Sequence, residues 1–145
     1  MKTGDLASSQ RWDEAADVVI VGTGFSGLAA AIVAKELGLS VILIEKRPTP
    51  GGNSIIAGGG ANAVDPLRQG RQGITDSIDL HFRQTMEGGD HINEPEKVRE
   101  MVDNALDGAV NYLERLGVEW PEKVVRGFGS LYERTHYPGY YIDKN

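Results

Sequence analysis

The sequence predicts an α/β fold that begins with a Rossmann-like βαβ unit and continues as helices. Two short apolar runs, Asp17–Val21 and Ser40–Ile44, are rich in β-branched residues, as expected of strands buried on both faces. Between them, the alanine-rich stretch from Ser26 to Leu37 has high helix propensity, and Gly38 ends it. Strands joined by such a helix form a parallel pair with a right-handed crossover.

Two further helices are predicted after this unit. The first covers Thr75–Glu87, where Ile78, Phe82 and Met86 form an apolar stripe and a glycine pair follows. The second has Asn93 as its N-cap, Pro95 in its first turn and Glu96 at the capping-box position. Its predicted core face, which ends before Gly117, consists of Val98, Met101, Val102, Ala105, Ala109, Leu113 and Leu116.

Composition limits the function classes. The chain has 145 residues, enough for one ordinary domain with a modest core. A net charge of −6 without a basic run argues against nucleic-acid binding. The absence of cysteine excludes disulfides and thiolate metal sites, and no metal site is expected. The chain shows neither a signal-peptide core nor a membrane span, so we expect a cytoplasmic protein, or a periplasmic one if a leader has been removed.

The loop after the first strand contains three glycines at GxGxxG spacing. Gly22 permits a tight turn from strand to helix, Gly24 lets the backbone approach a pyrophosphate, and Gly27 lets helix and strand pack closely. The helix that follows offers unpaired N–H groups and partial positive charge to phosphates. The spacing alone would indicate only a glycine-rich turn, but strand, helix and second strand occur in the order of a dinucleotide-binding unit.

An acidic residue completes this pattern. Glu45 stands at the end of the second strand, 18 residues after Gly27, where a carboxylate can accept hydrogen bonds from a ribose diol. The same negative charge repels a 2′-phosphate, which disfavours NADP. The pattern therefore predicts a dinucleotide site, but NAD and FAD share this fingerprint.

The segment "GGNSIIAGGGANA", residues 51–63, favours FAD over NAD. Pro48 and Pro50 give a stiff extended exit from the second strand, and two glycine groups then flank an apolar pair. Such a chain can lie along a long ligand and come close to a planar ring. A surface loop is the alternative, which Ile55, Ile56 and Val64 make less favourable because apolar residues are uncommon in exposed loops.

The motifs "VVIVGTGFSGLAAA" and "LIEKRPTPGGNSIIAGGGANA" resemble the fumarate reductase/succinate dehydrogenase flavoprotein superfamily, above all the soluble flavocytochrome c-type fumarate reductases. The resemblance covers residues 15–142. It implies an extended FAD, with the pyrophosphate on Ser26 and the adenosine ribose on Glu45. Residues 57–60 would pass the reactive edge of the flavin. The expected FAD-binding residues are Gly22, Gly24, Phe25, Ser26, Gly27, Glu45, Lys46, Arg47, Gly52, Asn53, Ser54, Ala57, Gly58, Gly59 and Gly60.

One departure from the family bears on how FAD is held. Membrane-bound respiratory members attach FAD covalently to a histidine just before the second glycine group, whereas this chain reads "GGNSII" there. We therefore expect non-covalent FAD. The nearest histidine, His81, belongs to a predicted helix and is not assumed to substitute.

The resemblance implies an FAD-dependent oxidoreductase that reduces or desaturates a C–C double bond of a fumarate-like enoate by hydride transfer from flavin N5. A small dicarboxylate or enoate would be the substrate, and an electron-donor protein or further polypeptide a possible partner. An NAD-binding domain and a non-catalytic flavin- or nucleotide-binding subunit are the alternatives. No catalytic residue is assigned: Arg134 and His136 are expected in an exposed loop.

The expected organisation has three parts: a polar leader over residues 1–14, an FAD-binding domain over 15–120, and the start of a connection to a capping domain over 121–145. The resemblance implies that the capping domain and the proton-donating arginine lie beyond Asn145. We therefore expect a polypeptide of these 145 residues to be inactive by itself.

Overall fold

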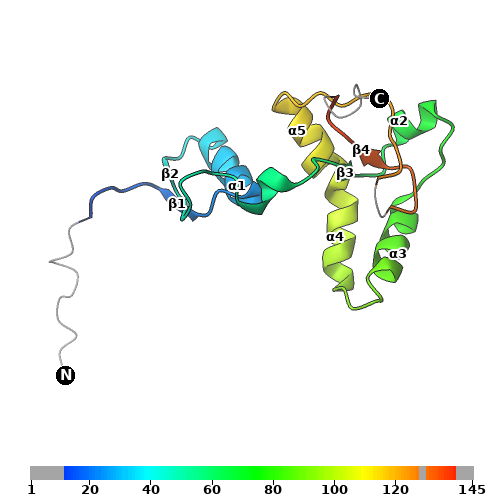
Figure 1. Ribbon diagram of the computed structural model, residues 1–145, viewed down its shortest axis with the longest axis horizontal. Coiled ribbons are helices and arrows are strands. Elements are labelled where there is room, and N and C mark those ends of the chain that lie inside the picture. The colour runs from blue at the N-terminus through cyan, green and yellow to red at the C-terminus, as the bar shows by residue number, and fades with distance from the viewer. Residues whose placement is uncertain (1–11, 128–129, 140–145) are drawn as a thin grey trace. The chain divides into compact units, whose positions relative to one another are not determined.

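A computed structural model describes residues 12–127 and 130–139, and its elements belong to two compact units (Figure 1). The first unit ends at Ala57 and the second begins at Gly58. Most of the expected polar leader lies outside the described residues. The expected domain boundaries at residues 14 and 120 stay predictions.

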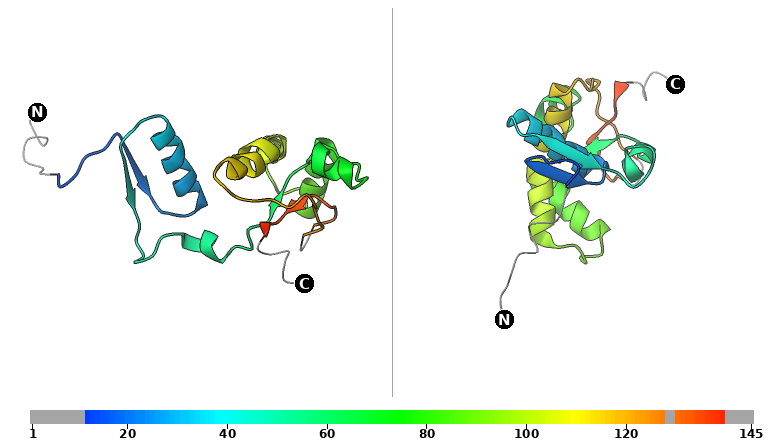
Figure 2. Two further views of the ribbon diagram at one scale, coloured as in Figure 1. Left: turned by 90° about the horizontal axis from the view of Figure 1, so that it is seen from above. Right: turned by 90° about the vertical axis from the view of Figure 1, so that its left-hand side faces the viewer.

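The first unit is the predicted βαβ unit. Strands β1 (Val18–Val21) and β2 (Val41–Ile44) pair in parallel, with Val18 opposite Val41 and Val21 opposite Ile44. Helix α1 (Phe25–Glu36) connects them and lies alongside the pair (Figure 2). The helix ends as expected at Gly38, whose φ of +79° lets the Gly38 N–H return to the carbonyl of Lys35 at 2.9 Å.

The expectation that both strands are buried on both faces is wrong for this chain. The side chain of Ile20 packs near α1, whereas Val19 and Val21 on the other face are 54% and 82% exposed. On the second strand, Leu43 and Ile44 are also exposed. A two-stranded sheet with one helix has cover for only one face, so apolar side chains remain at the surface of the other.

The second unit is mainly helical, with a short antiparallel strand pair. Its strands β3 (Ala61–Asn62) and β4 (Thr135–His136) pair with Ala61 opposite His136. The helical segments are α2 (Pro66–Arg71), α3 (Ile78–Gly88), α4 (Pro95–Ala105), the π-helix η2 (Leu106–Asn111) and α5 (Tyr112–Arg115). Helices α3 and α4 run side by side (Figures 1 and 2).

The predicted stripe on α3 is confirmed. Met86 is buried with Val98 and Val102 of α4, and Ile78 and Phe82 pack against this cluster. Helix α3 begins three residues after its predicted start at Thr75, and Ser77 caps it by accepting from the N–H of Leu80 at 3.1 Å.

The predicted N-cap of α4 is wrong. Glu94 occupies the N-cap position without a side-chain capping bond, and Pro95 opens the helix as expected. Asn93 instead donates from Nδ2 to the carbonyl of Thr85 at 3.0 Å. Its side chain therefore adds a second donor to a carbonyl near the C-terminal end of α3, which also accepts from the N–H of Gly89 at 3.2 Å.

The π-helix changes which residues of the long helix face the core. Val110 is fully buried with Trp120 and Ala63, although the predicted face contained Ala109 instead. Met101 and Leu116, both predicted to be core residues, are 51% and 44% exposed. A π-turn takes up an additional residue, so the apolar periodicity shifts along the helix after Ala105. Met101 lies before this shift, which therefore does not explain its exposure. Among the described residues, no helix combines the length and apolarity that a membrane crossing requires.

Candidate functional site

The loop between β1 and α1 has the geometry that a phosphate-binding turn requires. Gly22 has a φ of +99°, and its N–H donates to the carbonyl of Ile44 at 2.7 Å. A Cβ atom at Gly27 would lie 2.1 Å from the carbonyl oxygen of Gly22 and 3.4 Å from the side chain of Ile20. Only glycine therefore allows α1 to pack so closely on β1, as predicted for the third position of the motif.

The N-terminus of α1 retains free hydrogen-bond donors. Gly24 is the N-cap in an extended conformation, and Phe25 N–H donates to Ser54 Oγ at 2.9 Å. The N–H groups of Ser26 and Gly27, in the first turn, have no acceptor among the described residues, as expected at a helix start. A Cβ atom at Gly24 would meet only Ser54 Oγ, at 3.7 Å. Space and donors for an anion thus coincide at this end of the helix.

Glu45 stands just after β2 and is held by hydrogen bonds. Its Oε2 atom accepts from the hydroxyl of Thr23 at 2.5 Å and from the N–H of Thr23 at 3.0 Å. Its Oε1 atom accepts from the N–H of Arg47 at 3.0 Å. These bonds, the Thr23 hydroxyl first, lower the pKa of Glu45 to about 2. The ionised carboxylate has further lone-pair sites, so it can also accept from a ligand hydroxyl.

The segment after Pro50 forms a turn that is tied to the same loop. Gly51 and Gly52 have φ values of +113° and +52°, and the N–H of Gly51 donates to Thr23 Oγ1 at 3.0 Å. A 3₁₀ turn, η1 (Gly52–Ile56), follows. Ile55 and Ile56 are 71% and 83% exposed. Their contact with a flavin ring stays a prediction.

The predicted binding residues belong to both units. The glycines of the first loop, Glu45 and Ser54 lie together in the first unit, as the distances above show. Gly58, Gly59 and Gly60 begin the second unit and lead into β3. Gly59 has a φ of +71°, and a Cβ atom at Gly60 would lie 2.7 Å from the ring of Tyr137. Glycine is therefore required at residue 60 for close packing inside this unit.

Thr23 is the contact residue that the sequence interpretation missed in the first unit. It occupies a variable position of the GxGxxG motif. A signal was available, because a hydroxyl residue after one strand and an acid after the neighbouring parallel strand meet at the same sheet edge.

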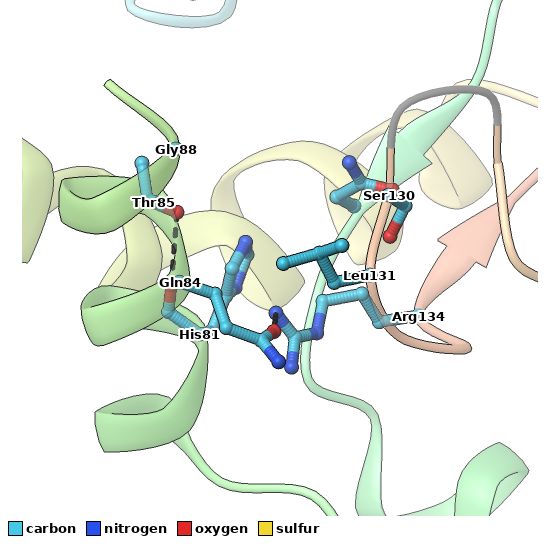
Figure 3. Close-up of a pocket in the computed structure, with 8 residues that line it drawn as sticks. His81, Gln84, Thr85, Gly88, Ser130, Leu131 and Arg134 are labelled. Carbon is cyan, nitrogen blue, oxygen red and sulfur yellow. Dashed lines mark hydrogen bonds between the residues drawn. The ribbon is translucent and has the colours of Figure 1, made fainter. Parts of the chain in front are cut away.

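A polar pocket of about 340 Å³ lies in the second unit (Figure 3). Arg134 borders it, donates from Nη1 to Gln84 Oε1 at 2.9 Å, and pairs with Asp76. Arg134 is only 3% exposed, so the expectation of an exposed loop arginine is wrong. The other lining residues are Asn62, His81, Thr85, Gly88, Ser130 and Leu131.

His81 lies at this pocket as a buried, neutral side chain. It is 6% exposed, and no described residue is a hydrogen-bond partner of its Nδ1 atom. Burial, and then the positive charge of Arg134, lower the pKa of His81 to about 4. The imidazole is therefore uncharged near neutral pH.

His136 is also buried, contrary to the expectation of an exposed loop histidine, and is 1% exposed. Its Nδ1 atom lies 3.2 Å from the carbonyl oxygen of Ala61, and its Nε2 atom 3.2 Å from Asp65 Oδ2. The ring therefore links β3, β4 and the N-cap of α2.

The chain is similar to known flavoproteins. A model of the FAD binding domain family matches residues 17–142. NADH:fumarate oxidoreductase of Klebsiella pneumoniae (strain 342) is 41% identical over 137 residues, which are 92% of this chain and 15% of that protein. Fumarate reductase (cytochrome) of Shewanella frigidimarina is 41% identical over 122 residues, 84% of this chain and 21% of that protein.

A solved structure shows the same similarity to fumarate reductases. The open conformation of a flavocytochrome c3 fumarate reductase superposes with a TM-score of 0.78 at 36% sequence identity, over 88% of this chain and 22% of that chain. The chain thus spans between 15% and 22% of the length of these relatives.

Proposed function

Because the chain belongs to the FAD-binding domain family, with FAD as its cofactor, we propose that it is part of an oxidoreductase that reduces the C–C double bond of an enoate such as fumarate. The family match decides between the two dinucleotides that the GxGxxG motif left open. The relatives named for fumarate support the substrate class. A small dicarboxylate is accordingly the proposed substrate.

One observation in the structure carries the cofactor proposal. The free N–H groups at the start of α1 and the ionised carboxylate of Glu45 lie at the same edge of the β1–β2 pair. The N–H groups suit a pyrophosphate, and the carboxylate suits a ribose hydroxyl. These residues fit an FAD whose adenosine half lies across the first unit.

Each of these residues has a separate proposed task. Ser26 and Gly27 donate backbone N–H bonds to the pyrophosphate, and Gly24 leaves room for it. Ser54 accepts from Phe25 N–H, so its own hydroxyl proton is free to reach a phosphate oxygen. Glu45 binds the ribose. The remaining predicted contacts, Lys46, Arg47, Gly52, Asn53 and residues 57–60, are part of the same proposal.

FAD supplies hydride transfer between flavin N5 and a substrate carbon when bound. The chain's own residues bind and orient the cofactor. We assign no residue of this chain to proton donation, because Arg134 is already paired with Asp76 and His136 lies between two acceptor oxygens. Non-covalent attachment and a partner that delivers electrons complete the proposal.

The test is to purify the full-length protein, add FAD, and follow reduction of fumarate with a chemically reduced viologen as electron donor. We expect flavin absorption in the purified protein and oxidation of the donor that depends on both FAD and fumarate. Flavin binding without turnover on fumarate, acrylate or urocanate would contradict the substrate proposal. Failure to bind FAD would contradict the cofactor proposal as well.

A further inference from the structure

We infer that Thr23 positions the ribose-binding carboxylate for FAD, an inference that rests on the proposed function. Its hydroxyl holds Glu45 in one orientation and ties that carboxylate to the turn at residues 51–56. Thr23 does not have to touch the cofactor for this role. It acts through Glu45 and through the backbone of Gly51.

The first step is the bond between Thr23 and Glu45. Thr23 follows β1 directly and is 6% exposed. Its hydroxyl and its backbone N–H both donate to Oε2 of Glu45, at 2.5 Å and 3.0 Å. Two bonds from one residue to one oxygen restrict rotation of the carboxylate. The other oxygen, Oε1, also accepts from the N–H of Arg47.

The second step is the bond that Thr23 accepts. The N–H of Gly51 donates to Thr23 Oγ1 at 3.0 Å. Since the hydroxyl has a single proton, and that proton goes to Glu45, the bonds run in one direction from Gly51 through Thr23 to the carboxylate. The ionised end strengthens such a chain of hydrogen bonds. One hydroxyl thus connects the glycine loop, the acid after β2 and the turn after Pro50.

The consequence for binding is preorganisation. A free glutamate side chain loses rotamer freedom when it binds a ligand, and this loss weakens binding. Here Thr23 and the N–H of Arg47 already hold the carboxylate through bonds within the chain itself. Discrimination in favour of a ribose hydroxyl should therefore depend on the Thr23 hydroxyl, and not only on the Glu45 charge.

The test compares FAD with an FAD analogue whose adenosine lacks the ribose 2′-hydroxyl. Dissociation constants for both are measured by flavin fluorescence on the full-length protein, on Thr23→Val and on Thr23→Ser. Valine has the shape of threonine without the hydroxyl, and serine retains the hydroxyl. In the unaltered protein the analogue should bind about tenfold more weakly, the effect of one bond to a charged group.

We expect Thr23→Val to reduce this ratio to about twofold or less, and Thr23→Ser to restore most of it. If Thr23 only maintains the loop structure, Thr23→Val weakens both ligands by the same factor and leaves the ratio at about tenfold, which would overturn the inference. Glu45→Gln in the Thr23→Val background should then cause little further loss of the ratio.

Failure of the inference can be distinguished from failure of the proposed function. If the unaltered protein binds neither ligand, the cofactor proposal fails, and the inference with it. If Thr23→Val does not fold, as judged by circular dichroism, the comparison of Thr23→Ser with Thr23→Ala still tests the inference: serine keeps the hydroxyl and should retain most of the roughly tenfold ratio, and alanine should lose it. A ratio for Thr23→Ser identical to that of Thr23→Ala would contradict the role of the hydroxyl.

Discussion

Arg134 and Asp76 form a two-point ion pair inside the second unit, although 58 residues separate them in the sequence. Arg134 Nε donates to Asp76 Oδ2 at 2.9 Å, and Arg134 Nη2 donates to Asp76 Oδ1 at 2.7 Å. Their side chains are 4% and 1% exposed. Gln69 also donates from Nε2 to Asp76 Oδ2 at 2.8 Å. The pair therefore joins the end of the described chain to the segment between α2 and α3.

Removing one partner of this pair should strongly destabilise the second unit. In Asp76→Asn or Arg134→Leu the other charged group stays buried without its partner, and the free energy of unfolding should fall by about 3–5 kcal/mol. Urea unfolding measures this by the fluorescence of Trp120, which is buried in the same unit.

The matched control is the exposed pair of Arg126 and Glu133, whose side chains are 58% and 36% exposed. Arg126→Ala should change the free energy of unfolding by no more than about 1 kcal/mol. Equal effects at the two pairs would contradict the importance of burial at Arg134.

The second unit should lose stability between pH 6.5 and 4 through His81. Its folded pKa of about 4 lies below the usual 6.5, so the unfolded chain binds more protons in this range. The stability that the neutral His81 side chain contributes is fully present above pH 6.5. About 2 kcal/mol of this free energy of unfolding should be lost at pH 5. Urea unfolding at pH 7.5 and 5 measures the change.

His81→Gln is the control for this titration, because it removes the imidazole and leaves the other acidic and basic groups in place. The variant should lose about 2 kcal/mol less than the unaltered protein between the two pH values. The same pH dependence in both proteins would show that His81 does not titrate in the way its burial indicates.

The βαβ unit could be predicted because it is encoded locally. The apolar runs, the alanine-rich helix and Gly38 each specify conformation within a few residues, and the structure confirms all three. The N-cap at Asn93 was wrong because a neighbouring helix competed for the same side chain. No local pattern marks the π-helix, so the core face beyond Ala105 could not be followed by a 3.6-residue period.

The contacts of the candidate site likewise include some that the local sequence predicts and others that depend on how distant segments pack. The separate residues of the nucleotide loop follow from motif spacing, and their contacts across 20 to 30 residues follow from the parallel strands. The pairing of Arg134 with Asp76 depends on how β4 packs against the segment before α3, and the periodicity of the sequence does not predict this packing. The burial of His136 depends equally on its strand partner Ala61.

Alanine at Gly24 and at Gly27 should have different effects. Gly24 has a φ of −67°, and its Cβ would have only an ordinary contact with Ser54, so Gly24→Ala should fold normally. Its methyl group occupies the approach to the pyrophosphate, and we expect FAD affinity to fall about tenfold or more. Gly27→Ala brings a methyl group 2.1 Å from the backbone of Gly22 and should reduce both affinity and stability.

Fluorescence titration with FAD and hydrogen exchange of the β1 and β2 amides measure the two quantities separately. Unchanged FAD affinity in Gly24→Ala would contradict the proposed position of the pyrophosphate. Normal protection of the strand amides in Gly27→Ala would contradict the close packing of α1.

FAD should leave the protein on acid precipitation. No histidine occurs in the segment Gly51–Ile56, and His81 is buried in the second unit, so neither offers an accessible imidazole for a covalent bond. The measurement is flavin absorption in the supernatant and the pellet after precipitation. Flavin that stays with the polypeptide would contradict non-covalent attachment.

A polypeptide of residues 1–145 should expose apolar surface and show little or no enoate reduction. Val19 and Val21 lie on an uncovered face of the sheet, and Ile55 and Ile56 are also exposed. Apolar side chains on a parallel sheet are normally covered on both faces, so this surface should bind a hydrophobic dye such as ANS. Val21→Thr, matched in shape, should reduce dye binding. The residues matched here are only 15% and 21% of the two relatives named for fumarate, and this chain offers no residue assigned to proton donation. Rapid fumarate reduction by the FAD-loaded polypeptide, without dye binding, would contradict both parts of this prediction. It would also require Arg126, Arg134 and His136 to be tested as proton donors, despite the bonds that the two buried residues already make.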